Sequence, residues 1–123
     1  CVYELHGSVH RNYCQRCGAF YDARYILESE GVPRCSCGGV IKPDVVLYEE
    51  GLDSKVIRGA VNAISRADML IIGGTSLAVY PAAGLIDYFS GRHLVLINRD
   101  ATPRDRQADL LIQGNIGEVL SGI

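Results

Sequence analysis

Met69-Leu70-Ile71-Ile72 followed by Gly73-Gly74-Thr75-Ser76 places an uninterrupted apolar run directly before a polar glycine turn. Such a run is typical of a strand that is buried on both faces of a parallel sheet. Two similar runs follow at Leu94-Val95-Leu96-Ile97 and at Leu110-Leu111-Ile112. Helix-like segments separate the runs, so residues 40–123 are predicted to form an α/β unit with an open, doubly wound parallel sheet.

Helical periodicity marks the segments between these strands. Asp53 or Ser54 is expected to cap a helix that runs to about Ala67, because apolar residues recur on one face at Val56, Ile57, Ala60, Val61 and Ile64. Further helices are expected at about 81–90 and 116–120. Before the first helix, Val45-Val46-Leu47-Tyr48 reads as a strand, and Pro43 in front of it indicates a strand start or a sheet edge.

Two tight cysteine pairs lie near the beginning of the chain, Cys14-Gln15-Arg16-Cys17 and Cys35-Ser36-Cys37. This arrangement fits one tetrahedral Zn²⁺ held by four thiolates, with a second pair one residue shorter than C-x-x-C. Disulfides are the alternative, but loops this short constrain the unfolded chain little. A fifth cysteine, Cys1, has no evident partner. We therefore expect a structural zinc and a reducing, cytoplasmic location.

Composition limits the classes of partner. The net charge of −2 provides no basic field for nucleic acid or for an anionic membrane. No apolar run approaches the ~18 residues that a membrane span needs. Because the chain begins with Cys1 rather than Met, we expect it to be a piece of a longer protein.

Polar residues follow each of the three buried strands. These turns are Gly73-Gly74-Thr75-Ser76, Asn98-Arg99-Asp100 and Gln113-Gly114-Asn115. Ligands of open parallel sheets bind at the carboxyl ends of the strands, and three polar turns at one edge suit a nucleotide. Each turn taken alone is also consistent with ordinary turn chemistry.

Histidine offers a candidate general base. His6 precedes Gly7 and is expected at a strand end beside a tight turn, although a hydrogen-bonded surface histidine is the competing interpretation. His10 is a possible zinc ligand, but four thiolates already complete a tetrahedron. His93 opens a buried strand, and we expect its role to be structural.

Five segments occur in order along the chain: 4–10 (Glu-Leu-His-Gly-Ser-Val-His), the two cysteine pairs, 42–50 (Lys-Pro-Asp-Val-Val-Leu-Tyr-Glu-Glu), 73–79 (Gly-Gly-Thr-Ser-Leu-Ala-Val) and Ile97-Asn98. Together they resemble the sirtuins, which are NAD-dependent protein lysine deacylases. The resemblance extends over essentially the whole chain. It implies a partial Rossmann-like sheet with an inserted zinc-ribbon module, divided into a histidine segment (1–13), the zinc module (14–39) and the NAD-binding part (40–123).

The resemblance also implies roles for individual residues. His6 corresponds to the catalytic base, which takes a proton from a ribose hydroxyl of NAD. In that family, acyl-lysine and NAD yield free lysine, nicotinamide and O-acyl-ADP-ribose. Residues Val45, Val46, Leu47 and Tyr48 correspond to the strand that pairs with an acyl-lysine peptide. The expected NAD contacts are Gly74, Thr75, Ser76, Asn98, Arg99, Asp100 and Gln113, and the zinc ligands are Cys14, Cys17, Cys35 and Cys37.

The chain departs from the sirtuin pattern in two ways. Tyr48-Glu49-Glu50 stands where sirtuins often have Phe-Gly-Glu, so Glu49 is expected to alter the substrate groove. The glycine-rich NAD loop and the nicotinamide segment, which precede the histidine motif in sirtuins, are not in this sequence. We therefore expect the isolated chain to be inactive and to self-associate through the apolar surface of an incomplete sheet.

Two alternatives to the deacylase remain. One is a non-catalytic module in which a zinc ribbon and an α/β half-domain recognise a partner or a nucleotide. The other keeps the sirtuin fold but transfers ADP-ribose to protein. The acyl-chain preference and the protein substrate are not readable from these residues.

Overall fold

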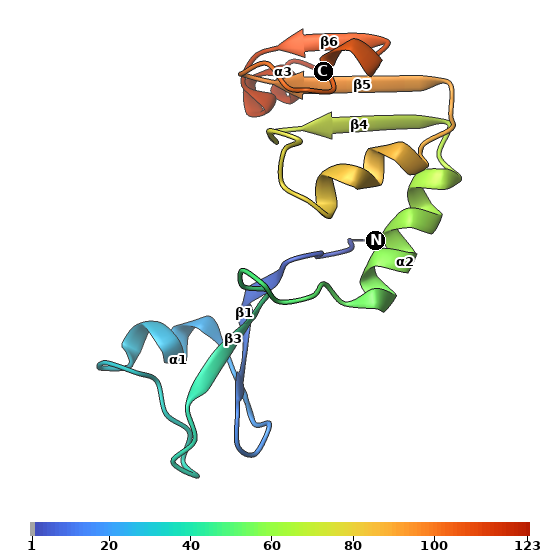
Figure 1. Cartoon of the computed structure of the whole chain (residues 1–123). Helices are drawn as coiled ribbons and strands as arrows, with labels where there is room; N and C mark the ends of the chain where they lie inside the picture. Colours follow the sequence, from blue (N-terminus) through green and yellow to red (C-terminus); the bar gives the residue numbers. More distant parts are fainter. Residues whose placement is uncertain (1) are drawn as a thin grey trace. The chain divides into compact units, whose positions relative to one another are not determined.

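The structure, a computed structural model, describes residues 2–123. Cys1, expected to be an unpaired thiol, lies outside the described residues. The chain divides into two compact units, Cys1–Val56 and Ile57–Ile123 (Figure 1). Within residues 2–123 no helix has the length and apolarity that a membrane crossing requires. The expected division into 1–13, 14–39 and 40–123 stays a prediction.

An antiparallel sheet with the strand order β2-β1-β3 forms the first unit. Its strands are β1 (Gly7–Cys14), β2 (Phe20–Tyr21) and β3 (Ile41–Val45). A short helix, α1 (Ala23–Glu28), follows β2, and the carboxylate of Asp22 caps it by accepting from the backbone N–H of Tyr25 at 2.9 Å.

A bulge interrupts the pairing of β1 with β3. Ser8 pairs with Asp44 and Asn12 with Pro43, so the backbone of residues 9–11 has no paired residue on β3. Asn12, which is 1% exposed, holds the bulge, because its amide donates to the carbonyls of Val9 at 3.0 Å and Tyr21 at 3.3 Å. This side chain therefore joins β1 to β2 next to the cysteine pairs.

The strand expected at Val45–Tyr48 is displaced toward the N-terminus, since β3 covers Ile41–Val45 and contains Pro43. Proline is tolerated there because β3 is an edge strand that pairs only with β1. The strand ends where a turn begins: the N–H of Glu50 donates to the carbonyl of Leu47 at 3.1 Å. The expectation that 45–48 is regular strand was therefore wrong beyond Val45.

The second unit contains the parallel sheet predicted from the three apolar runs, with the order β4-β5-β6. Its strands are β4 (Met69–Gly73), β5 (His93–Asn98) and β6 (Leu110–Gln113). The helical elements of this part of the chain are α2 (Ser54–Ser65), η1 (Ala82–Tyr88), η2 (Asp105–Gln107) and α3 (Ile116–Ser121), where η1 and η2 are 3₁₀ helices. Asp53 caps α2, as expected, by accepting from the backbone N–H of Lys55 and Val56.

Burial within this sheet is uneven. The central strand β5 carries the core residues Leu94, Leu96 and Ile97. On β4, by contrast, Met69 is 51% and Ile71 is 54% exposed, so the expected burial of this strand on both faces was wrong for the chain as described. Met69 and Ile71 are two residues apart and lie on the same face of β4, so that face is not covered within the described residues.

Candidate functional site

The four paired cysteines converge at the end of the first unit. The sulfur atoms of Cys14, Cys17, Cys35 and Cys37 all lie within 4.8 Å of one another. Cys14 Sγ is 3.5 Å from Cys37 Sγ, and Cys17 Sγ is 3.5 Å from Cys35 Sγ. A tetrahedral zinc with Zn–S bonds of about 2.3 Å places its sulfurs about 3.8 Å apart. The donor set therefore fits one structural Zn²⁺ with no open coordination position.

The shorter cysteine pair reaches the cluster through a tighter turn. In the first pair, the N–H of Gly18 donates to the carbonyl of Cys14 at 2.9 Å. In the second pair, the N–H of Gly38 already closes on the carbonyl of Cys35 at 2.8 Å, one residue sooner. Gly39 is required beside it, since a Cβ there would lie 2.6 Å from Cys14 Sγ.

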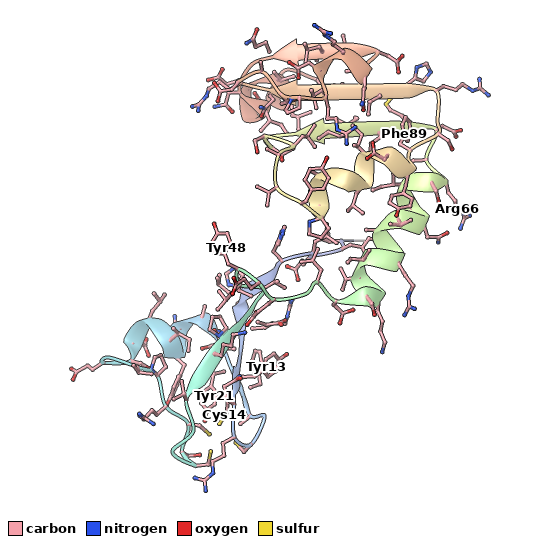
Figure 2. The ribbon with its side chains drawn as sticks, in the orientation of Figure 1. Tyr13, Cys14, Tyr21, Tyr48, Arg66 and Phe89 are labelled. Carbon is pink, nitrogen blue, oxygen red and sulfur yellow. The ribbon has the colours of Figure 1, made fainter. Side chains whose placement is uncertain are left out.

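Hydrogen bonds shift the pKa values of the thiols in this cluster. The hydroxyl of Tyr21 donates to Cys35 Sγ at 3.0 Å and, with the N–H of Cys37, lowers the pKa of Cys35 to about 6. For Cys37, the N–H of Gly39 favours the thiolate, but hydrogen bonds with Cys14 and Cys35 outweigh it and raise the pKa to about 12. Several thiolates at such distances repel one another unless a cation joins them. Figure 2 shows Tyr21 beside Cys14 in this unit.

His6 lies beside the segment expected to bind the peptide. Its backbone carbonyl accepts from the N–H of Val46 at 3.1 Å, and the next residue, Gly7, pairs with Val45. The side chain of His6 is exposed. Gly7 has a positive φ of 75°, and a Cβ there would overlap the carbonyl oxygen of Asp44, so only glycine permits this close approach.

The turn after Val46 is held by a charged network. Glu50 accepts from Lys42 Nζ at 2.9 Å and from the backbone N–H of Leu47 at 3.0 Å. The N–H of Leu47 and then Lys42 lower the pKa of Glu50. Tyr48 is 99% exposed and points away from the ribbon in Figure 2, whereas Glu49 has a positive φ of 68°.

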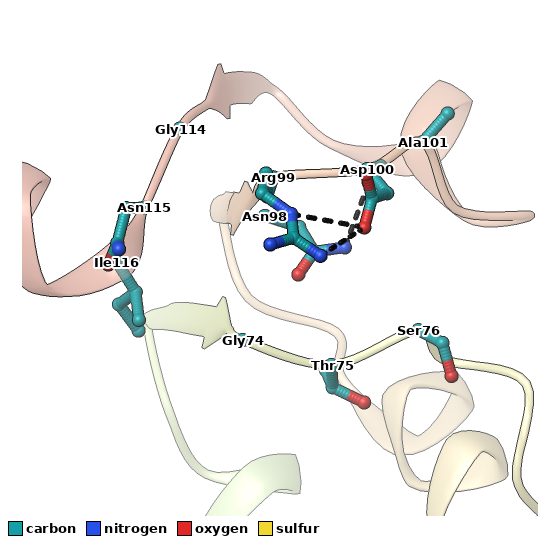
Figure 3. A pocket seen from close by; sticks show the side chains of 10 residues that line it. All are labelled: Gly74, Thr75, Ser76, Asn98, Arg99, Asp100, Ala101, Gly114, Asn115 and Ile116. Carbon is teal, nitrogen blue, oxygen red and sulfur yellow. Dashed lines mark hydrogen bonds and ion pairs between the residues drawn. The ribbon is translucent and has the colours of Figure 1, made fainter.

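The carboxyl ends of the three parallel strands form one pocket of about 350 Å³ in the second unit. The turns after β4, β5 and β6 contribute its walls, as Figure 3 shows. Its lining residues are Gly74, Thr75, Ser76, Asn98, Arg99, Asp100, Ala101, Gly114, Asn115 and Ile116. The structure thus brings together six of the seven residues that we expected to contact a nucleotide.

Gln113 is the exception among the expected nucleotide contacts. It does not line the pocket, and its amide donates to the carbonyl of Arg99 at 3.4 Å. Four lining residues were not among the expected NAD contacts: Ala101, Gly114, Asn115 and Ile116. Gly114 and Asn115 belong to the polar turn after β6 that the sequence did point to as part of a nucleotide site. Ala101 and Ile116 are apolar, and nothing in their sequence context indicated a ligand contact.

Some polar groups of the pocket are already held by hydrogen bonds, and others remain able to bind a ligand. Asn98 Nδ2 donates to the carbonyl of Asp100 at 2.8 Å, which folds the wall after β5. The ion pair between Arg99 and Asp100 is 3.3 Å long and highly exposed, so solvent screens it and a ligand is able to displace it. Thr75 Oγ1 accepts from the N–H of Leu77 at 3.2 Å and keeps its own proton to donate. These groups suit the hydroxyls and phosphates of a nucleotide.

Comparison with protein families matches residues 1–81 to the Sir2 family. The NAD-dependent protein deacetylase of Clostridium perfringens is 65% identical over 99% of this chain and 51% of its own length. That of Clostridium acetobutylicum is 60% identical over the same shares. A solved structure described as Sir2 with a p53 peptide and NAD⁺ is 40% identical, with a TM-score of 0.87 over 98% of this chain and 53% of its own. The chain spans about half the length of the curated relatives it matches.

Zinc affinity should depend on pH through the four thiols. Because zinc binds thiolates, its affinity should fall as pH falls, most steeply as Cys35 is protonated near its pKa of about 6. At pH about 7.5, binding should release at least one proton, from Cys37. Chelator competition across pH and calorimetry in buffers of different ionisation enthalpy measure both effects. Absence of zinc by elemental analysis, or an affinity independent of pH, would contradict the four-thiolate site.

Glu49→Gly should stabilise the first unit. A left-handed backbone penalises a side chain by ~1–2 kcal/mol, and glycine loses about 0.5–1 kcal/mol of entropy on ordering, so the expected gain is about 0.5–1 kcal/mol. Urea denaturation of the zinc-loaded protein measures it. Glu49→Ala is the matched control, because it removes the carboxylate but keeps the Cβ. An equal gain in both variants would show that charge, not backbone conformation, is responsible.

Proposed function

The chain belongs to the Sir2 family, and we propose that it forms the zinc module and part of the NAD site of an NAD-dependent protein lysine deacetylase. The observation that carries the proposal is the backbone hydrogen bond between His6 and Val46. It holds the candidate general base beside the segment expected to bind an acyl-lysine peptide. A module that only binds a nucleotide has no need of that arrangement.

His6 is proposed to take the proton from a ribose hydroxyl of NAD. Histidine is the side chain most used for proton transfer near neutral pH, and the imidazole of His6 is exposed at the end of β1. In this scheme the acyl oxygen first displaces nicotinamide from C1′ of the ribose, and the deprotonated hydroxyl then attacks the acyl carbon. Lysine leaves as the free amine, one water is consumed, and the acyl group remains on ADP-ribose. One solved relative, described as Sir2 with 2′-O-acetyl-ADP-ribose and a deacetylated p53 peptide, supports this outcome.

Peptide binding is proposed along Val45, Val46, Leu47 and Tyr48 by strand addition. The fold limits which main-chain groups can pair with the peptide, because the N–H groups of Val46 and Leu47 already donate to His6 and to Glu50. The remaining main-chain groups of the segment and the exposed ring of Tyr48 are left for the peptide. Glu50, fixed by Lys42, would keep this turn in its binding conformation.

The turns after β4, β5 and β6 are proposed to bind the adenosine diphosphate part of NAD. Asn98, Arg99 and Asp100 face Gly74, Thr75 and Ser76 across the pocket (Figure 3). Gln113 would act indirectly, by supporting Arg99 through its hydrogen bond. The four cysteines of the zinc cluster are not joined by disulfides, and zinc bound by reduced cysteines is typical of a reducing compartment, so we propose a cytoplasmic location.

His6→Gln should strongly slow acyl transfer in the intact enzyme that contains this chain. Loss of the general base is expected to lower the rate by ~10²–10⁴-fold. His10→Gln is the matched control, since His10 lies in the bulge of β1 and belongs to neither proposed site. Mass spectrometry of peptide and O-acyl-ADP-ribose distinguishes deacetylation from ADP-ribosylation. Full activity of the His6 variant would contradict the assignment.

The isolated chain is proposed to self-associate through the parallel sheet. Met69, Ile71 and Leu110 are each about half exposed, and the strand register places Ile71, Val95 and Leu110 side by side on one face. A second copy would remove this apolar surface from water.

Ile71→Lys and Leu110→Lys should shift the isolated chain toward monomer in sedimentation experiments, because each places a charge on the proposed contact face. Leu27→Lys is the control, because Leu27 is 85% exposed on α1 in the other unit. A wild-type monomer that binds no hydrophobic dye would contradict self-association.

A further inference from the structure

A polar cluster links the two connections that form opposite walls of the pocket. The connection from β4 to β5 contributes Gly74, Thr75 and Ser76, and that from β5 to β6 contributes residues 98–101. Arg104 on the second connection donates from Nη1 to Asp87 Oδ1 at 2.9 Å and from Nη2 to Asp87 Oδ2 at 3.0 Å. Its Nη2 also lies 3.3 Å from the hydroxyl of Tyr80. Both acceptors belong to the first connection.

The guanidinium of Arg104 is largely buried and makes a two-pronged contact with the carboxylate of Asp87. The side chain of Arg104 is only 17% exposed, although Asp87 is 56% exposed. Two parallel N–H···O bonds fix the planar guanidinium in both distance and orientation, which a lysine ammonium does not do. In residues 2–123, every hydrogen bond that the structure shows between these two connections involves Arg104.

A hydrogen-bonded turn at residues 102–105 joins Arg104 to the pocket wall. Thr102 is 9% exposed and donates from Oγ1 to Asp105 Oδ1 at 2.6 Å. The same Oγ1 accepts from the backbone N–H of Arg104 at 3.2 Å, and the N–H of Thr102 also donates to Asp105. Ala101, which lines the pocket, directly precedes this turn. Arg104 is therefore connected through this turn to the wall after β5.

We propose that Arg104, held by Asp87 and Tyr80, is a positioning residue that sets the separation of the two pocket walls and thereby the affinity for the ADP part of NAD. The inference rests on the proposed function, because it takes this pocket to be the nucleotide site. Arg104 touches no reacting atom in this scheme. Its loss should weaken nucleotide binding and leave the chemical step unchanged.

The test measures the dissociation constant of ADP-ribose, together with kcat and the KM for NAD, in the intact enzyme that contains this chain. Arg104→Lys keeps the charge and loses the two-pronged contact, so the Kd and KM should rise about 3–10-fold while kcat stays within about 2-fold. Asp87→Asn should raise the Kd and KM to a similar extent. The double variant of Arg104→Lys and Asp87→Asn should raise them no more than either single change. Arg106→Lys, exposed on η2, is the matched control.

The outcomes separate this inference from the function on which it rests. If Asn98→Ala weakens ADP-ribose binding but Arg104→Lys keeps the wild-type Kd, the positioning role is wrong and the nucleotide site stands. If the wild-type enzyme binds no ADP-ribose, both are wrong. A fall in kcat at unchanged Kd would also overturn the positioning role. Should Arg104→Lys fail to fold, Tyr80→Phe, which removes one hydroxyl, should still raise the Kd.

Discussion

The convergence of four sulfur atoms within 4.8 Å is the constraint on which the first unit depends. Its buried cluster is small and consists of Cys14, Cys35 and Ile41, so two of the metal ligands are themselves the core. A core of this size supplies little folding free energy, and a bound metal ion would supply the rest. β1 begins at Gly7, directly after His6, and ends at Cys14. The cluster therefore anchors one end of the strand that follows the candidate base and that pairs with β3.

The second unit is organised by hydrophobic burial rather than by a metal site. Hydrophobic burial along β5 fixes three parallel strands, and their carboxyl ends necessarily open at one edge. Gly73 lets α3 approach that edge, because a Cβ there would overlap Ile116 Cδ1. The pocket thus follows from the sheet itself, while the Arg104 cluster connects the loops that extend beyond it. The cysteine cluster organises the unit with the proposed peptide segment, and sheet topology organises the unit with the proposed nucleotide pocket.

The turn at 47–50 shows how sequence and fold constrain one another. Glu50 is drawn back onto Leu47 and Lys42, which ends β3 and places Glu49 in the left-handed region. Sirtuins often have glycine at the position of Glu49, the residue best suited to that backbone. The chain retains the turn because the bonds of Glu50 hold it, and it presents a carboxylate next to the proposed peptide segment.

The sequence alone determined the features that depend on local order: the parallel strands, which were expected at 69–72, 94–97 and 110–112 and lie within one residue of those bounds, the cysteine pairs and the polar turns after each strand. These features can be predicted because apolar runs and strand-end turns are specified by residues that are adjacent in the sequence. Only the tertiary structure decided the start of β3 at Ile41, the exclusion of Gln113 from the pocket and the partnership of Arg104 with Asp87. Those outcomes depend on edge pairing and on contacts between residues far apart in the chain. A long polar side chain gives no sign in the sequence of which distant group it will reach.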